Sequence, residues 1–341
     1  MDLFPDGAFV RLRSRAISWK YLHADGDWAG VSLRRCGRVP SLEAVWRVEH
    51  WVHEGVTYLR LQSAAYGRYL ALSGEDAGED APSGHLGLKA AQRDIDDSTM
   101  VNFLSWRWRV ERVKPLKNYV RLRHFNRDLR ANGRLLMWNN GVTVDFNLAR
   151  RLSTMMQWTV HPVAATSVPL PFPAAPPAHQ IPLQQIPLLL WRRIWRGRQL
   201  PVPARTIRHV RASDEGNFDQ NHLNWRAFGI YDHSVFNLRT QLGQLQHDWN
   251  GDMFGFTLCI RPGLNGRLMP LVTDLPRSLD PMYIVVLRTG SPDLMRSADR
   301  KRSKIAFQFE NINFLKALCG NNDERFCKVT LVVVTNIISV G

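Results

Sequence analysis

The stretch Val10-Arg11-Leu12-Arg13-Ser14 decides the fold, because two closely similar stretches follow it in the first half of the chain. They read Leu59-Arg60-Leu61-Gln62-Ser63 and Val120-Arg121-Leu122-Arg123-His124. Apolar and polar residues alternate in each stretch, which is typical of a β-strand with one buried face. A sequence repeated at this spacing defines the architecture, so the rest of the chain is interpreted from it.

Two further phrases follow each opening in the same order. The second phrases are Tyr21-Leu22-His23-Ala24, Tyr69-Leu70-Ala71-Leu72 and Asp128-Leu129-Arg130-Ala131, and the third are Trp46-Arg47-Val48-Glu49, Trp108-Arg109-Val110-Glu111 and Trp158-Thr159-Val160-His161. A further pair of apolar residues at strand period lies between them in each unit, and Gly-containing turns separate the phrases. Four strands in each of three units, without helices, predict a closed barrel with pseudo-threefold symmetry.

The three tryptophans of the third phrases, Trp46, Trp108 and Trp158, occupy equivalent places in the repeat. Large aromatic rings dominate the burial of apolar surface in protein cores. We therefore interpret them as equivalent core residues and prefer this to an aromatic platform for a ligand.

The order of these phrases resembles a family of uncharacterised plant proteins, whose N-terminal domain is grouped with the actin cross-linking, fascin-like β-trefoils. The resemblance covers most of residues 1–162 and recurs in residues 204–295. It implies a mainly β chain with an N-terminal β-trefoil and a smaller α+β, ubiquitin-like (β-grasp) domain. The expected organisation is a trefoil over 1–162 with repeats at about 8–50, 57–112 and 118–162, a Pro-rich linker over 163–203, the ubiquitin-like domain over 204–295 and a poorly ordered tail over 296–341.

The residues of the second domain support the same topology. Strands are expected at 206–212, 225–231, 256–260, 268–272 and 282–287. Between the second and third of these, Ser234 fits a helix N-cap and is followed by Val235, Leu238, Leu242 and Leu245 at helical spacing. Two strands, a helix and further strands form the order of a β-grasp, although no C-terminal Gly-Gly for conjugation is present.

Residues 162–203 hold ten of the nineteen prolines and predict a semi-extended spacer. Within it, Leu188–Arg198 combines apolar and basic residues, so it could dock on a membrane surface or a partner. Packing back onto one of the domains is the interpretation we prefer. The tail opens with the basic run Arg300–Lys304, a nuclear-localisation signal or a solvated segment, and closes with the strand-forming Leu331–Val334.

The distribution of charge and the spacing of the cysteines exclude some classes of protein. The net charge of +15 is spread along the chain, and residues 204–295 balance nine basic against nine acidic side chains. Four scattered cysteines argue against a zinc site or a disulfide framework. No secretory signal is visible, and the longest apolar stretch, 329–340, is too short to span a bilayer. We expect an intracellular protein, cytoplasmic by default, with the nucleus as the alternative.

The sequence contains no motif of a catalytic or cofactor site. Asp25-Gly26-Asp27 could begin a calcium loop, but the oxygen ligands do not continue at the required spacing, so a turn is preferred. The histidines are scattered, and none accompanies a nucleophile in a known motif. We expect a protein that is not an enzyme, with no catalytic residue, cofactor or metal.

Three kinds of partner follow. The resemblance implies a protein partner, actin in particular, on the trefoil surface. Nucleic acid is the second, suggested by the basic first half and by Trp106-Arg107-Trp108-Arg109, where strand period puts both tryptophans on one face and both arginines on the other. Carbohydrate ranks lowest, because Gln157-Trp158 matches the lectin phrase Gln-x-Trp only without its spacer.

The candidate partner-binding residues are Arg11, Arg13, Arg121 and Arg123, because they are expected to point outward from equivalent strands. Solvation of a basic barrel exterior explains these four arginines equally well. The oligomeric state is left open.

Overall fold

The computed structural model describes residues 2–36, 41–77, 87–95, 105–114, 118–133, 140–146, 152–164, 205–245 and 255–289. All of them belong to one compact unit, Met1–Leu294. The linker predicted over 163–203, apart from its first two residues, and the tail predicted over 296–341 lie outside the described residues, as does the segment Leu188–Arg198.

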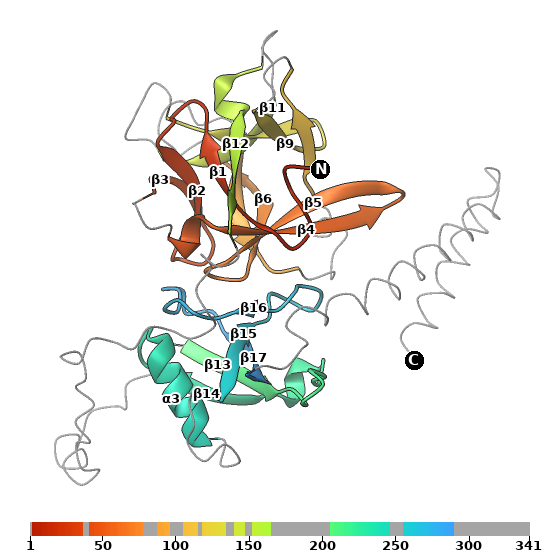
Figure 1. Ribbon diagram of the computed structural model, residues 1–341. Helices are drawn as coiled ribbons and strands as arrows, with labels where there is room; N and C mark the ends of the chain where they lie inside the picture. The colour runs from red at the N-terminus through yellow and green to blue at the C-terminus, as the bar shows by residue number, and fades with distance from the viewer. Residues whose placement is uncertain are drawn as a thin grey trace, which may run out of the picture. The chain divides into compact units, whose positions relative to one another are not determined.

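The N-terminal half is a β-trefoil of three four-stranded units, as the repeats predict (Figure 1). The strands are β1 (Phe9–Ser14), β2 (Lys20–Ala24), β3 (Val31–Arg35), β4 (Trp46–His53), β5 (Val56–Ser63), β6 (Tyr69–Asp76), β7 (Leu88–Arg93), β8 (Arg109–Arg112), β9 (Val120–His124), β10 (Arg127–Ala131), β11 (Val142–Phe146) and β12 (Trp158–Val163). Short 3-10 helices at Leu42–Ala44 and Thr154–Met156 precede β4 and β12.

The first strand of each unit pairs antiparallel with the last strand of the unit before it. We call these pairs the seams: seam 1 joins β12 to β1, seam 2 joins β4 to β5, and seam 3 joins β8 to β9. Seam 1 closes the barrel, with six residue pairs between Phe9↔Val163 and Ser14↔Trp158. Closure leaves the N-terminal strand paired on both sides.

Three buried tryptophans anchor the units in the same way. The indole Nε1 donates to a carbonyl oxygen of the second strand of its own unit: Trp46 to Leu22 at 3.1 Å, Trp108 to Leu70 at 3.0 Å and Trp158 to Leu129 at 2.9 Å. All three side chains are fully buried in one core cluster. The prediction of three equivalent core tryptophans is confirmed.

The second domain is ubiquitin-like, with a five-stranded sheet and one described α-helix. Its elements are β13 (Arg205–Arg211), a 3-10 turn (His222–Asn224), β14 (Arg226–Ile230), α3 (Val235–Leu245), β15 (Phe256–Ile260), β16 (Met269–Pro270) and β17 (Met282–Arg288). The strand order is β14-β13-β17-β15-β16, with β13 and β17 parallel. No helix in the described residues is both long and apolar enough to cross a membrane.

Two details of this domain compare directly with the sequence. Ser234 accepts a hydrogen bond from the Asn237 N–H at 3.3 Å and so caps α3, as predicted. The strand predicted over 268–272 is reduced to Met269–Pro270, and the proline contributes no N–H to a ladder.

A buried polar network joins the two domains, which the sequence did not predict. Arg267 of the ubiquitin-like domain places its guanidinium Nε 3.5 Å from a carboxylate oxygen of Glu49 in β4. Its backbone N–H donates to the Tyr69 hydroxyl at 3.0 Å, and its carbonyl accepts from Gln62 at 2.7 Å. The Tyr69 hydroxyl in turn donates to Glu49 at 2.8 Å. The side chains of this network are almost fully buried.

The tryptophan anchors predict a stability effect that is similar in each unit. Trp46→Phe, Trp108→Phe or Trp158→Phe removes the indole donor and leaves a buried carbonyl without its partner, which costs about 2 kcal/mol. Denaturant unfolding of the full chain measures the loss. Trp19→Phe is the control because Trp19 is 43% exposed, so its change stays within about 0.5 kcal/mol. Equal losses at Trp19 and at the anchors would contradict this account.

His23 predicts a loss of stability on acidification. Burial lowers the pKa of His23 from 6.5 to about 4, so between these values the unfolded chain binds a proton that the folded chain does not. Stability therefore falls as the pH drops from 6.5 towards 4, by about 3 kcal/mol from this residue. Unfolding free energies across this range check it: His23→Gln should flatten the slope relative to the parent chain, and an unchanged slope would refute it.

Candidate functional site

The three seams place equivalent residues opposite one another, counted from the anchoring tryptophans. Three positions after each tryptophan stand Glu49, Glu111 and His161, and opposite them stand Arg60, Arg121 and Arg11. Two of the predicted contact residues, Arg11 and Arg121, are thus symmetry-equivalent. The equivalent residue of the second unit, Arg60, was not among the predicted ones.

At seams 2 and 3 the arginine is balanced by the opposing carboxylate. Arg60 lies 3.3 Å from Glu49, and Arg121 donates to Glu111. Arg123 approaches the same Glu111 carboxylate at 3.3 Å. Burial raises the pKa of Glu111, but the hydrogen bonds and charges of these two arginines outweigh it, and the pKa is lowered overall.

At seam 1 a histidine stands in the place of the glutamate. The Arg11 guanidinium lies 5.3 Å from the Tyr21 ring centroid and donates to the Cys36 sulfur at 3.4 Å. Within the described residues, neither Arg11 nor Arg13 forms an ion pair with a carboxylate. The four predicted arginines therefore separate into two surroundings, Arg121 and Arg123 beside a glutamate and Arg11 and Arg13 without one.

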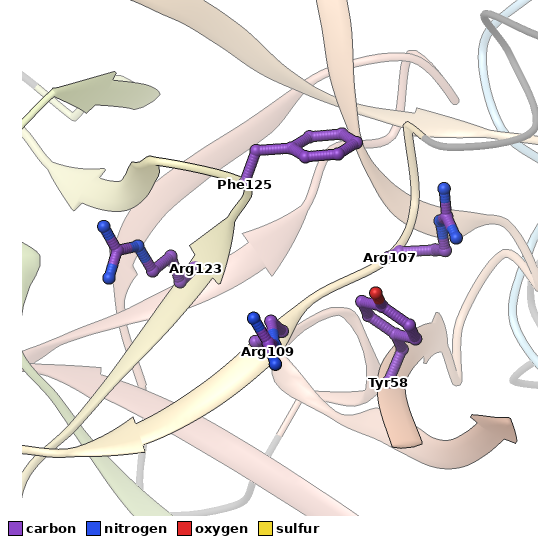
Figure 2. A pocket seen from close by; sticks show the side chains of 5 residues that line it. All are labelled: Tyr58, Arg107, Arg109, Arg123 and Phe125. Atoms are coloured by element: carbon purple, nitrogen blue, oxygen red, sulfur yellow. The ribbon is translucent and has the colours of Figure 1, made fainter. Parts of the chain in front are cut away.

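A pocket of about 70 Å³ lies at seam 3 (Figure 2). It is lined by Tyr58, Arg107, Arg109, Arg123 and Phe125. Arg109 and Arg123 are directly opposite each other in the β8–β9 ladder. The equivalent pairs of the other seams are Arg47↔Gln62 and Thr159↔Arg13, so among the seams this like-charged pair belongs to seam 3.

Tyr58 lines the pocket because its neighbour in β5, Leu59, forms backbone hydrogen bonds with Trp108, the residue that precedes β8. The Leu59 N–H donates to the Trp108 carbonyl at 2.7 Å, and the Trp108 N–H donates back to Leu59 at 2.9 Å. This bridge sets Tyr58, which precedes Leu59, beside the arginines that flank Trp108. The aromatic wall of the pocket is therefore a consequence of how the second unit closes on itself.

Phe125 is held in the pocket by a strained turn. It follows β9 in the two-residue connection to β10, where His124 pairs with Arg127, and its φ is +53°. A bulky residue rarely adopts this conformation. Its side chain is nonetheless 64% exposed, and the ring packs edge-on against His124, 5.0 Å away between centroids. Strain that exposes an apolar ring is characteristic of functional sites.

Arg107 differs from its predicted outward position. It is 8% exposed, and its guanidinium lies 5.1 Å from the ring centroids of both Trp51 and Tyr58. Burial lowers the pKa of this guanidinium. The prediction of strand alternation over 106–109 fails because β8 begins at Arg109. Trp106 accordingly packs in a small cluster of its own with Tyr69, Ala71 and Ile95.

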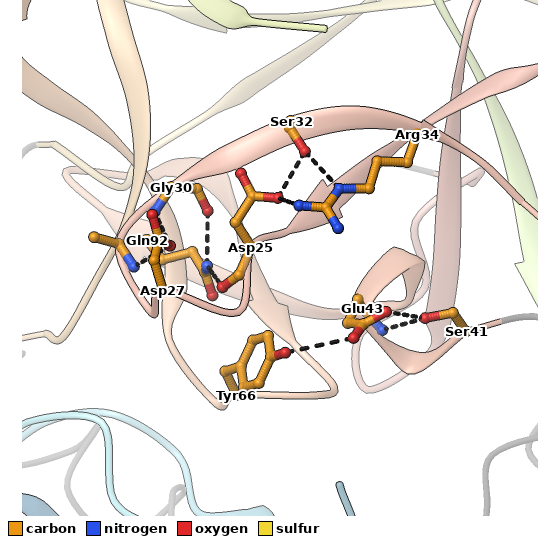
Figure 3. A network of polar contacts seen from close by, with 10 residues as sticks. Asp25, Asp27, Gly30, Ser32, Arg34, Ser41, Glu43, Tyr66 and Gln92 are labelled. Carbon is orange, nitrogen blue, oxygen red and sulfur yellow. Dashed lines mark hydrogen bonds and ion pairs between the residues drawn. The ribbon is translucent and has the colours of Figure 1, made fainter. Parts of the chain in front are cut away.

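The acidic segment Asp25-Gly26-Asp27 forms a turn, as preferred from the sequence (Figure 3). One oxygen of Asp27 accepts from the Gly30 N–H at 2.8 Å and the Ala29 N–H at 3.0 Å. Asp25 accepts from Ser32 and from Arg34, both at 2.6 Å. These carboxylates thus hold the turn together.

Gln157, the residue that suggested a lectin phrase, is buried and forms hydrogen bonds within the trefoil. It is 3% exposed, and its amide donates to the Leu152 carbonyl at 3.0 Å and the Ser153 carbonyl at 3.3 Å. Its side-chain oxygen accepts from Arg15. Neither it nor the buried Trp158 is available to stack on or bond to a sugar.

Four pocket residues, Tyr58, Arg107, Arg109 and Phe125, were not predicted as site residues. Arg109 carried a usable signal, because it follows an anchoring tryptophan just as Arg47 does and aligns with Arg123 once the seam register is known. Phe125 carried none, since its exposure depends on a turn conformation that its residue type disfavours.

Comparison with known proteins identifies both domains. Residues 1–161 match the family model described as a β-trefoil domain of unknown function (DUF569), and residues 203–287 match the DUF569-associated ubiquitin-like domain. No curated protein matches the sequence.

Several solved structures match part of this chain. The ricin B-like lectin of Macrolepiota procera, in complex with lactose, is 16% identical, with 46% of this chain and 96% of that chain covered and a TM-score of 0.34. The SDF2-like protein of Arabidopsis thaliana is 14% identical, with 46% and 94% covered and a TM-score of 0.34. The designed threefold-symmetric protein ThreeFoil is 16% identical, with 45% and 96% covered and a TM-score of 0.32.

Proposed function

Because the chain belongs to the family that joins a DUF569 β-trefoil to its associated ubiquitin-like domain, we propose that it is a non-enzymatic binding protein whose seam 3 pocket takes an acidic segment of a protein partner. One observation carries the proposal: Arg109 and Arg123 are directly opposite each other in the β8–β9 ladder, and both line a pocket.

The opposed arginines favour a carboxylate ligand. Like charges directly opposite in a sheet destabilise it. Glu111, which lies diagonal to Arg123 in the ladder, offsets the charge of Arg123 at 3.3 Å. Arg109 is exposed and has no ion-pair partner in the part of the chain that the structure describes. A carboxylate placed between the two guanidinium groups would accept charge-assisted hydrogen bonds from both.

The aromatic residues favour a protein partner over a bare anion. Tyr58 and Phe125 flank the arginines, and the exposed ring of Phe125 offers apolar surface next to the charged groups. Aromatic residues and arginine are the types most enriched at the centres of protein interfaces. The ligand that fits is an extended segment with Asp or Glu beside an apolar side chain.

Charge reversal tests the pocket. Arg109→Glu should weaken binding of a polyglutamate peptide to the full chain about tenfold or more, measured by fluorescence anisotropy at fixed salt. Arg112→Glu is the matched control, since Arg112 carries the same charge on the same strand and pairs instead with Asp2 at 3.3 Å. Equal loss in the two variants would mean that net charge, and not the pocket, governs binding.

Filamentous actin is the specific partner that the fascin-like resemblance implies, and co-sedimentation tests it directly. If actin is the partner, the full chain and Arg112→Glu pellet with filaments and Arg109→Glu stays in the supernatant. Absence of pelleting at micromolar protein would exclude actin and leave the polyglutamate result to judge the pocket. Nucleic acid would instead bind with a steep salt dependence that both arginine variants reduce alike.

A further inference from the structure

Comparison of the three seams isolates seam 1 as a second cationic site, independent of the pocket at seam 3. The equivalent sets are Glu49, Arg60 and Tyr69 at seam 2, Glu111, Arg121 and Asp128 at seam 3, and His161, Arg11 and Tyr21 at seam 1. An arginine is present in each set, so the fold accommodates a cation at this position three times. The residues that surround the arginine differ.

At seams 2 and 3, carboxylates of the chain itself balance the charge of the arginine. Glu49 approaches Arg60 at 3.3 Å and also receives Arg267 from the ubiquitin-like domain. At seam 3, Arg121 bonds to Glu111 and lies 3.6 Å from Asp128. Each of these arginines thus has a fixed counter-charge within the chain.

Seam 1 lacks that counter-charge. His161 pairs directly with Arg11 in the ladder, and Arg13 lies two residues further along the same face of β1. The His161 ring meets the Tyr21 ring edge-on, 5.9 Å away between centroids. In the described residues, Arg11 Nε and His161 Nε2 are buried atoms without a hydrogen-bond partner. Two guanidinium groups and an imidazole therefore converge without a carboxylate.

We propose that seam 1 binds an oxyanion group, phosphate or sulfate, between Arg11, Arg13 and His161. The side chains of Arg11 and Arg13 start about 7 Å apart, as alternate residues of a strand do, so both can reach one group lying over the strand. A tetrahedral oxyanion has enough acceptor oxygens for hydrogen bonds from the N–H groups of two guanidinium groups and from one imidazole N–H. Arginine is the residue best suited to such groups.

His161 makes the site respond to pH. Burial, followed by the charges of Arg13 and Arg11, lowers the pKa of His161, so the free ring is neutral near pH 7. The ring faces these two arginines from β1 and Tyr21 from β2. A bound oxyanion stabilises the protonated ring and so raises its pKa. Binding therefore takes up a proton and tightens as the pH falls from neutral towards the lowered pKa of the ring.

Replacement of His161 by the residue of the other two seams tests the proposal. His161→Glu supplies Arg11 with the counter-charge that Arg60 and Arg121 already have, so the chain should fold with equal or higher thermal stability. Its affinity for inorganic sulfate, measured on the full chain by isothermal titration calorimetry, should fall about tenfold or more. Sulfate is the probe because it keeps its charge across the pH range.

Three further variants serve as controls for the sulfate-binding measurement. Leu279→Glu adds a carboxylate to a 69% exposed position of the ubiquitin-like domain and should leave sulfate binding unchanged. Arg13→Ala should lose binding without an added charge, which keeps the proposal testable if His161→Glu does not fold. Arg109→Glu should keep the part of the sulfate binding that His161→Glu and Arg13→Ala remove, so failure at seam 1 is distinguishable from failure of the seam 3 pocket.

Free phosphate and vesicles of phosphatidylcholine with a phosphatidylinositol phosphate then identify what carries the oxyanion. In either arm, binding must be lost in both His161→Glu and Arg13→Ala. Sulfate binding that is equal in the parent chain and in these two variants, or that does not tighten as the pH falls from 7 through the range in which His161 titrates, would overturn the proposal.

Discussion

The indole N–H···O=C bond of each anchoring tryptophan is the constraint on which the trefoil depends. Trp46 and Trp158 begin the last strands of their units and Trp108 immediately precedes β8, and each bonds to the second strand of its unit at 2.9–3.1 Å, within one core. Because large buried rings also fill the barrel, the bond sets position and packing together. These contacts recur at equivalent places of the repeat, and the seams likewise place equivalent residues opposite one another.

The three core tryptophans are equivalent, whereas the residues opposite the three seam arginines differ. Where Glu49 opposes the seam arginine, the ubiquitin-like domain docks through Arg267. A buried ion pair is weak support for stability, because desolvation offsets much of the attraction, but removing one partner leaves a costly charge. Where Glu111 opposes it, the like-charged pair that lines the pocket lies two ladder positions away. Where His161 opposes it, the arginine, Arg11, has no carboxylate partner among the described residues. The residues around one equivalent position thus differ from seam to seam, although the backbone pairing is the same.

The repeats and their turns could be predicted because they depend on local alternation and on spacing along the chain. The same holds for α3, whose cap and apolar positions are adjacent in sequence. Three features could not. The strain at Phe125 opposes its own propensity, Arg107 is buried because β8 starts later than alternation suggests, and the contact between Arg267 and Glu49 joins residues more than two hundred positions apart. Of the predicted site residues, Arg123 lines the pocket, and nothing in its sequence surroundings distinguished it from Arg121.

The central claim is that the seams differ in the charge left available, although their arginines are equivalent. Nuclear magnetic resonance of the arginine Nε–Hε groups in the full chain, during titration with polyglutamate, tests this most directly. The account predicts that Arg109 and Arg123 shift most, while Arg60, enclosed beside Glu49 and under Arg267, does not shift. Shifts of similar size at Arg60 and at Arg109, or uniform shifts over all arginines, would contradict it.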